Sequence, residues 1–143
     1  MSRIQDKVST GKDGYTFIKL DSGMTEVLRP SLYGARHPIV FHPSSGTTET
    51  EEVVIVGHCC ESGDLMSPMD GNPEAIGTRT LLKSEIGDYA VIGGSGGYCS
   101  SMNTKNYNSF PEAAEVIICE TGDDDARLIR KTQTLEHMWA NEL

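Results

Sequence analysis

Long apolar runs are missing from this 143-residue sequence. Apolar residues make up 37% of it, and no uninterrupted apolar stretch approaches the roughly 18 residues that a membrane-spanning helix needs. The segment Met1–Lys7 has no apolar stretch after its basic residue and no small-residue cleavage motif, so it does not resemble a secretion signal. We therefore expect a cytoplasmic protein without a membrane partner.

Basic residues are also scarce. The chain has 12 lysines and arginines against 21 aspartates and glutamates, which gives a formal net charge of −9. A surface of this sign repels the phosphate backbone, so nucleic acid is not an expected partner. The length fits one domain with a core of ordinary size.

The cysteines do not match a metal-binding pattern. Zinc sites usually pair cysteines or histidines that are two to four residues apart, whereas His58, Cys59 and Cys60 are contiguous. The spacing of His37 and His42 from His58 matches no standard ligand pattern either. We expect reduced thiols and no metal site, with a metal or thiol-redox module at His58–Cys60 as a weaker alternative. The four cysteines are Cys59, Cys60, Cys99 and Cys119.

Short stretches rich in β-branched and aromatic residues, bounded by turn residues, predict strands. Helical periodicity is absent from the same region, so we expect a mainly β domain, closed as a β-barrel or sandwich. The stretches at 52–57, 89–92 and 115–119 are short, nearly continuous apolar runs, which favours burial of the strand on both faces. Long polar loops are expected at 44–50, 65–82 and 93–111. The predicted strands are Tyr15–Leu20, Pro38–His42, Glu52–Gly57, Tyr89–Ile92 and Glu115–Cys119.

A C-terminal helix is predicted after the β-domain. Asp123–Asp125 can cap a helix N-terminus, and Leu128, Thr132, Leu135 and Trp139 then recur at near-helical spacing. The predicted organisation is therefore a β-domain over residues 1–122 and a helix over 123–143.

The run Cys60–Asp64 directly follows a predicted buried strand, where a rigid scaffold can present reactive side chains. A thiol with an ordinary pKa is mostly protonated at neutral pH and can donate a proton, and Glu61 beside it could hold an ammonium group. A small buried cysteine followed by a turn explains the same residues. Spacing alone slightly favours that second interpretation.

Two further segments could bind a ligand. Arg29 precedes Pro30, which stiffens the backbone, and an arginine fork can bind a carboxylate while Tyr33 adds a hydrogen bond. The glycines of Gly93–Tyr98 allow close approach of a ligand, but the run lacks the Gly-x4-Gly-Lys-Ser/Thr phosphate-binding pattern. A surface arginine with a packed tyrosine, and a glycine-rich hairpin, are the structural alternatives.

Taken in this order, the segments resemble the C-terminal part of the diaminopimelate decarboxylases, alanine-racemase-like enzymes that use pyridoxal phosphate. The resemblance covers about Phe17 to Ile118. The Cys-Glu-Ser run distinguishes this family from ornithine-type decarboxylases, which carry Cys-Asp there. The stretch from 66 to 82 looks longer than in the shorter family members. The matching segments are Asp21–Met24, Leu28–Tyr33, Gly57–Asp64, Gly97–Tyr98 and Asn106–Ser109.

The resemblance implies roles for five residues in converting meso-2,6-diaminopimelate to L-lysine and carbon dioxide. The residues that match Arg29 and Tyr33 bind the distal carboxylate of the substrate, and the one that matches Glu61 holds the distal ammonium group. The cysteine that matches Cys60 acts from the neighbouring subunit of a dimer in protonating the decarboxylated carbon. The tyrosine that matches Tyr98 contacts cofactor and substrate.

The resemblance also implies an N-terminal (β/α)8 barrel that carries the Schiff-base lysine for pyridoxal 5'-phosphate. Such a barrel takes about 250 residues, and neither that length nor a βα repeat is present here. None of the six lysines is assigned as the Schiff-base residue. We expect the chain to be a fragment, an isolated domain or one half of a split gene, inactive by itself. The alternative is a stand-alone, non-catalytic β-domain that binds or regulates a full-length decarboxylase.

Overall fold

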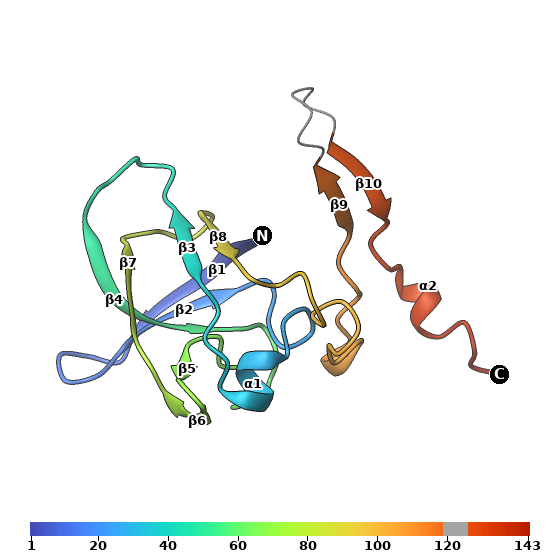
Figure 1. Cartoon of the computed structure of the whole chain (residues 1–143), viewed down its shortest axis with the longest axis horizontal. Helices are drawn as coiled ribbons and strands as arrows, with labels where there is room; N and C mark the ends of the chain where they lie inside the picture. Colours follow the sequence, from blue (N-terminus) through green and yellow to red (C-terminus); the bar gives the residue numbers. More distant parts are fainter. Residues whose placement is uncertain (119–125) are drawn as a thin grey trace. The chain divides into compact units, whose positions relative to one another are not determined.

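The computed structural model of the chain describes residues 1–118 and 126–143. These residues form two compact units, Met1–Thr104 and Lys105–Leu143. Both units are drawn in Figure 1, and each is described by itself.

The first unit is built mainly from strands, with one short helix (Figure 1). Its elements are β1 (Ser2–Ser9), β2 (Thr16–Leu20), α1 (Arg29–Tyr33), β3 (Ile39–His42), β4 (Thr50–Val56), β5 (Pro68–Met69), β6 (Asn72–Ile76), β7 (Arg79–Leu82) and β8 (Tyr89–Ile92).

A six-stranded sheet in the order β3-β8-β1-β2-β4-β7 forms the body of this unit. Its pairings are antiparallel except for β2 and β4, which run parallel. The outermost strands β3 and β7 contact one another, so the sheet curls into a nearly closed barrel. The prediction of a mainly β, barrel-like domain is confirmed.

The core lies inside the curled sheet. Because side chains alternate across a strand, every second residue of β2, β3 and β8 points inward. In β2 these residues are Ile18 and Leu20, both fully buried, and in β3 Phe41 is 1% exposed. All five predicted strands are present with bounds that agree to within two residues, and Cys119, the predicted end of the last, lies outside the described residues.

The expectation of burial on both faces holds only for β4. Val53, Val54 and Ile55 are all fully buried there, and β4 is paired along one edge with β2 and along the other with β7 and the 65–67 segment. In β8 burial alternates, with Tyr89 and Val91 outside. The strand β9 (Glu115–Ile118) is largely exposed. Apolar runs in β8 and β9 therefore do not mark two-sided burial.

The segment 65–82, expected to be a loop, contains three strands. β5 and β6 form a hairpin, and β7 pairs with β4. Ser67 stabilises this arrangement, since its hydroxyl accepts from the Ile55 N–H at 2.8 Å and donates to the Gly77 carbonyl at 2.9 Å. The strands arise from tertiary pairing, which the polar local sequence does not reveal. β1, which the sequence pattern also failed to indicate, pairs with β2 and β8 in the same way.

The second unit corrects the predicted C-terminal helix. The capping residues Asp123–Asp125 and the predicted boundary at 122/123 lie outside the described residues. Beyond them, residues 126–130 form a strand paired with β9 instead of a helix, and the helix covers one turn only. The elements are η1 (Tyr107–Ser109), β9 (Glu115–Ile118), β10 (Ala126–Arg130) and α2 (Leu135–Met138).

Local chemistry explains where α2 begins. The Thr134 hydroxyl accepts the His137 N–H while the His137 ring accepts the Thr134 N–H, which together form a capping box. Before it, the Gln133 side chain accepts the Glu112 N–H at 3.0 Å and contacts Asn106. These bonds hold residue 133 outside the helix. Within the described residues, no helix is long and apolar enough to cross a membrane.

Phe41→Ala tests the position of the core. Removing a buried aromatic ring leaves a cavity, and we expect the free energy of unfolding to fall by about 3–5 kcal/mol. Val40→Ala is the matched control, since Val40 is the next residue on the strand and is 51% exposed. Urea denaturation measures both. Equal losses for the two variants would contradict the inward orientation of Phe41.

Candidate functional site

Two loops of the first unit lie together because two strands are parallel. β2 and β4 pair with Phe17 opposite Val54 and Lys19 opposite Val56, so their carboxyl ends lie at the same edge of the sheet. The loop after β2 contains Gly23 and Met24, and the loop after β4 leads to Cys60. The sheet itself thus brings two of the sequence motifs side by side.

Asp64 joins these two loops. It is 2% exposed, and its carboxylate accepts the Met24 N–H at 2.7 Å and the Cys59 N–H at 2.8 Å. A Cβ at Gly23 or Gly57 would lie 2.4 Å or 2.2 Å from an Asp64 carboxylate oxygen. Both positions therefore require glycine, because a side chain would displace the buried carboxylate.

A second polar link runs beside the first. The Thr25 hydroxyl donates to Glu26 Oε2 at 2.6 Å and lies 2.7 Å from His58 Nε2. Since that hydroxyl hydrogen is used on Glu26, the His58 Nε2–H donates to the Thr25 oxygen. The loops after β2 and β4 are therefore fixed by a carboxylate and by a histidine–threonine contact.

The turn that follows presents Cys60 and Glu61 outward. Both are exposed, and the Asp64 N–H closes the turn on the Glu61 carbonyl at 3.0 Å. The Glu61 carboxylate accepts the Gly63 N–H at 2.9 Å. Burial and the nearby carboxylates, Asp64 foremost, raise the pKa of the Cys59 thiol to about 12. Of the two adjacent thiols, Cys59 is thus held in its protonated, unreactive form.

Arg29 opens the short helix α1. Pro30 occupies its first turn, which suits a residue without an N–H, and Gly34 ends it with a positive φ of 65°. Glycine is required there, because a Cβ would lie 2.4 Å from the Asn72 backbone nitrogen. The Gly71 N–H also donates to the Gly34 carbonyl at 3.0 Å. The β5–β6 hairpin therefore supports the helix that carries Arg29.

The Arg29 guanidinium lies between two tyrosines. Its Cζ atom is 5.9 Å from the ring centroid of Tyr33 and 5.9 Å from that of Tyr98. Contacts of this kind favour a cation and restrict its orientation. Tyr98 takes a positive φ of 68°, so the Gly93–Tyr98 loop turns sharply where it delivers this ring. Arg29, Tyr33 and Tyr98 thus form one cluster.

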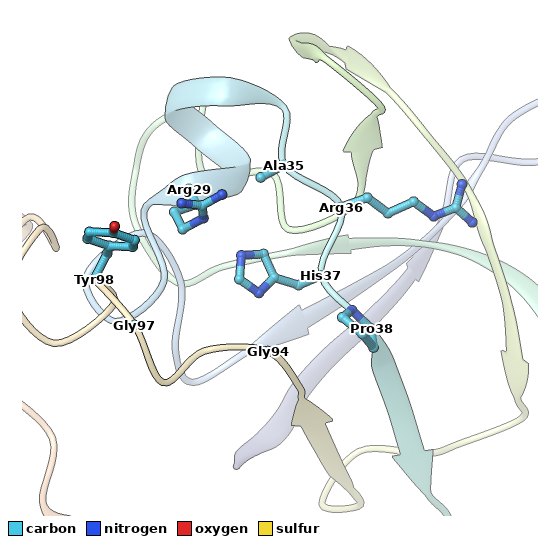
Figure 2. A pocket seen from close by; sticks show the side chains of 8 residues that line it. All are labelled: Arg29, Ala35, Arg36, His37, Pro38, Gly94, Gly97 and Tyr98. Carbon is cyan, nitrogen blue, oxygen red and sulfur yellow. The ribbon is translucent and has the colours of Figure 1, made fainter.

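An open cavity of about 480 Å³ adjoins this cluster, and Figure 2 shows its lining from close by. Arg29 and Tyr98 form one side, and His37 lies opposite them. Cys60, Glu61 and Tyr33 do not line it. The lining residues are Arg29, Ala35, Arg36, His37, Pro38, Gly94, Gly97 and Tyr98.

The cavity fits contact with a cofactor such as pyridoxal phosphate but not its covalent attachment. Tyr98 offers an exposed ring and hydroxyl, and a Cβ at Gly97 would meet nothing within 4 Å, so the loop is open to a ligand. No lysine is among the described residues that line the cavity. Residues 1–118 and 126–143 also contain no group of three His, Cys, Asp or Glu side chains arranged to hold a metal ion.

Sequence reasoning missed two residues of this region. Asp64 was read as a turn residue, although it is the carboxylate that joins the loops after β2 and β4. His37 is considered in the sequence only as a metal ligand, which its spacing does not support, whereas in the structure its ring lines the cavity beside Arg29. Nothing in the local sequence indicates either role, because the Met24 N–H lies 40 residues from Asp64 and the Gly93 carbonyl lies 56 residues from His37.

Asp64→Ala tests the link between the loops. Two backbone N–H groups would lose a charged acceptor, and we expect a loss of about 3 kcal/mol or more in the free energy of unfolding, measured by urea denaturation. Asp13→Ala, at an exposed turn position, should change stability by no more than about 0.5 kcal/mol. Asp64→Ala as stable as the control would show that the carboxylate does not hold the loops.

Thiol alkylation tests the difference between the adjacent cysteines. With a pKa of about 12, Cys59 is almost entirely protonated at pH 8, whereas the thiolate is the reactive form. We expect iodoacetamide to label Cys60 first and to leave Cys59 unmodified in the folded chain, as read by peptide mass spectrometry. In denaturant both should react. Equal labelling of the two in the folded chain would contradict the environment assigned to Cys59.

Comparison with known proteins agrees with the motifs and the fold. The sequence model described as "Pyridoxal-dependent decarboxylase, C-terminal sheet domain" matches residues 1–96. Diaminopimelate decarboxylase of Deinococcus radiodurans is 39% identical over 136 residues, which cover 95% of this chain and 32% of that protein. The same enzyme of Escherichia coli K12 is 37% identical over 131 residues, covering 89% of this chain and 30% of that protein.

The fold comparison gives the same result. A crystal structure of a diaminopimelate decarboxylase superposes with a TM-score of 0.87 at 34% identity, covering 99% of this chain and 33% of that one. The chain thus spans about a third of the length of the relatives that it matches. The resemblance to the diaminopimelate decarboxylases is confirmed, and the chain belongs to the pyridoxal-dependent decarboxylase family, as its C-terminal sheet domain.

Proposed function

We propose that this chain supplies the distal substrate-binding groups and the proton donor of a decarboxylase that converts meso-2,6-diaminopimelate to L-lysine and carbon dioxide. The observation that carries the proposal is the Arg29 guanidinium, held 5.9 Å from each of two tyrosine rings beside an open cavity. The family membership supplies the reaction type. The relatives, which are diaminopimelate decarboxylases, supply the substrate.

The far end of this substrate carries one carboxylate and one ammonium group. Arg29 can take the carboxylate with two parallel N–H donors, and the neighbouring Tyr33 hydroxyl can add a third. Glu61 offers a carboxylate oxygen to the ammonium group. One fixed cation and one fixed anion would then select a zwitterionic end over a neutral or singly charged one.

Cys60 is the proposed proton donor. When bound, pyridoxal phosphate would supply an electron sink for the pair left by the departing carbon dioxide. The Cys60 Sγ–H then donates its proton to the substrate carbon, and general acid catalysis of this kind accelerates a reaction by about 10²–10⁴-fold. Tyr98, beside Arg29 on the cavity wall, would contact both cofactor and substrate.

The proposed active site needs partners. A (β/α)8 barrel would carry the Schiff-base lysine, since no described lysine lines the cavity. Within one copy, Cys60 and Glu61 belong to a loop that does not line the cavity beside Arg29. This supports a dimer in which one copy contributes Arg29 and the other contributes Cys60. The cytoplasm, which keeps thiols reduced, suits a catalytic Cys60.

A second candidate is a non-catalytic domain that binds or regulates a full-length decarboxylase. The observation in its favour is the apolar surface of the β9–β10 ribbon, where Ile118 is 77% and Ile129 is 58% exposed. Leu128 adds to this surface at 56%. Exposed apolar side chains in this number are typical of a surface that contacts another protein.

Complementation distinguishes the two candidates. The chain is mixed with a separately produced barrel portion of a relative and pyridoxal phosphate, and carbon dioxide release is followed. We expect activity that Cys60→Ala lowers about 10²–10⁴-fold in kcat, while Cys59→Ala retains most of it. Arg29→Met should mainly raise KM, because a substrate-binding cation is lost.

Two results would count against the catalytic proposal. The first is no carbon dioxide release although both portions are folded and associated. The second is full activity in Cys60→Ala. If instead the chain captures a full-length decarboxylase and changes its activity equally with and without Cys60, the regulatory candidate is correct.

A further inference from the structure

His37 is a buried histidine in the wall of the Arg29 cavity. It is only 6% exposed, yet it is one of the residues that line the open space. The antiparallel pairing of β3 and β8 explains its position, because Ile39 lies opposite Ile92. Residue 37 just before β3 is therefore brought next to residues 93 and 94 just after β8.

The hydrogen bonding of His37 fixes its tautomer. The ring Nδ1 lies 3.0 Å from the Gly93 carbonyl oxygen, which can only accept, so Nδ1 carries the proton. In the neutral ring, Nε2 is then a hydrogen-bond acceptor. The Gly93 N–H donates to the Pro38 carbonyl at 2.8 Å, which holds the two backbone segments in place. The ring is thus anchored through Nδ1, and Nε2 is left to bind a ligand.

The second nitrogen faces the cavity. Figure 2 shows one ring nitrogen of His37 on the side of Gly94 and the other on the side of Arg29 and Tyr98. Because Nδ1 bonds Gly93, the nitrogen on the Arg29 side is Nε2. The Arg36 guanidinium points away from Arg29 in the same view.

The cavity therefore combines one strong donor group with one nitrogen acceptor. Arg29 supplies N–H donors for a carboxylate, and no carboxylate side chain is among the described residues that line the space. His37 Nε2 is the lining side-chain nitrogen that can accept an N–H. A ligand that satisfies both groups carries a carboxylate and an amine close together, which describes the α-amino carboxylate end of an amino acid.

We propose that His37 is a ligand-binding residue, whose Nε2 accepts an N–H from the amine of an α-amino carboxylate while Arg29 binds its carboxylate. The inference rests on the proposed function for the choice of meso-diaminopimelate as substrate. The inference goes beyond that function because it assigns an acceptor for the amine, His37 Nε2, to the same copy of the chain that carries Arg29. His37 then discriminates between amino acids and plain dicarboxylates.

Two substitutions distinguish the structural role of His37 Nδ1 from the proposed ligand-binding role of Nε2. In His37→Asn, the side-chain amide can replace Nδ1–H on the Gly93 carbonyl, but nothing replaces Nε2. In His37→Gln, the longer amide reaches the Nε2 position. Each variant is compared with the unchanged 143-residue chain by calorimetric titration at pH 8. The probes are meso-diaminopimelate, pimelate, which has the same carbon chain without the amines, and inorganic phosphate.

We expect the unchanged chain to bind meso-diaminopimelate more tightly than pimelate, with about five- to tenfold of that preference due to the hydrogen bond to His37. His37→Asn should lower the preference by that factor while leaving the affinity for pimelate unchanged, since Glu61 can still hold the ammonium group, and His37→Gln should lower it less. Nitrogen-15 spectra of the unchanged chain give an independent measurement. The Nε2 resonance of His37 should shift with meso-diaminopimelate and stay in place with pimelate.

Several results would overturn the inference. They are an equal preference in the unchanged chain and His37→Asn, an Nε2 resonance that does not respond while pocket residues do, and tighter binding of phosphate than of meso-diaminopimelate. A failure of the proposed reaction can be distinguished from a failure of this inference. Complemented halves that release no carbon dioxide would reject the reaction but not a preference that depends on His37.

Discussion

The parallel pairing of β2 with β4 is the constraint on which the site depends. It brings the loops that follow both strands to one edge of the sheet, and there the buried Asp64 carboxylate accepts an N–H from each. Two glycines are needed so that the carboxylate fits between the loops. A buried charge is stable only when its hydrogen bonds are satisfied, so the loops and Asp64 hold one another in a single arrangement.

The rest of the site follows from that arrangement. The loop after β4 turns outward and exposes Cys60 and Glu61, and the loop after β2 continues into α1, which begins with Arg29. The tyrosine rings beside Arg29 come from α1 itself and from the loop after β8. Arg29 with its two tyrosines and the Cys60 thiol therefore lie on separate segments that one sheet positions. An active site shared between two copies would reunite them.

Much of this could be predicted from the sequence where local chemistry decides the structure. The β-branched runs of β2, β3 and β4 marked strands, and the ordered motifs marked the Arg29 and Cys60 segments. Prediction failed where tertiary pairing decides. The polar stretch 65–82 forms strands because β4 pairs with β7 and Ser67 bonds to the backbone of β4. Leu128 lies in a strand because β10 pairs with β9. The roles of Asp64 and His37 depend on contacts across 40 and 56 residues, which no local pattern encodes.

Backbone hydrogen exchange tests the central claim most directly. If Asp64 joins the two loops, the amides of Met24 and Cys59 are protected although neither residue lies in a strand. The predicted result is exchange as slow as that of amides in β2 and β4. Exchange as fast as that of the exposed loop 44–49 would contradict the account, because the two loops would then open independently of the sheet.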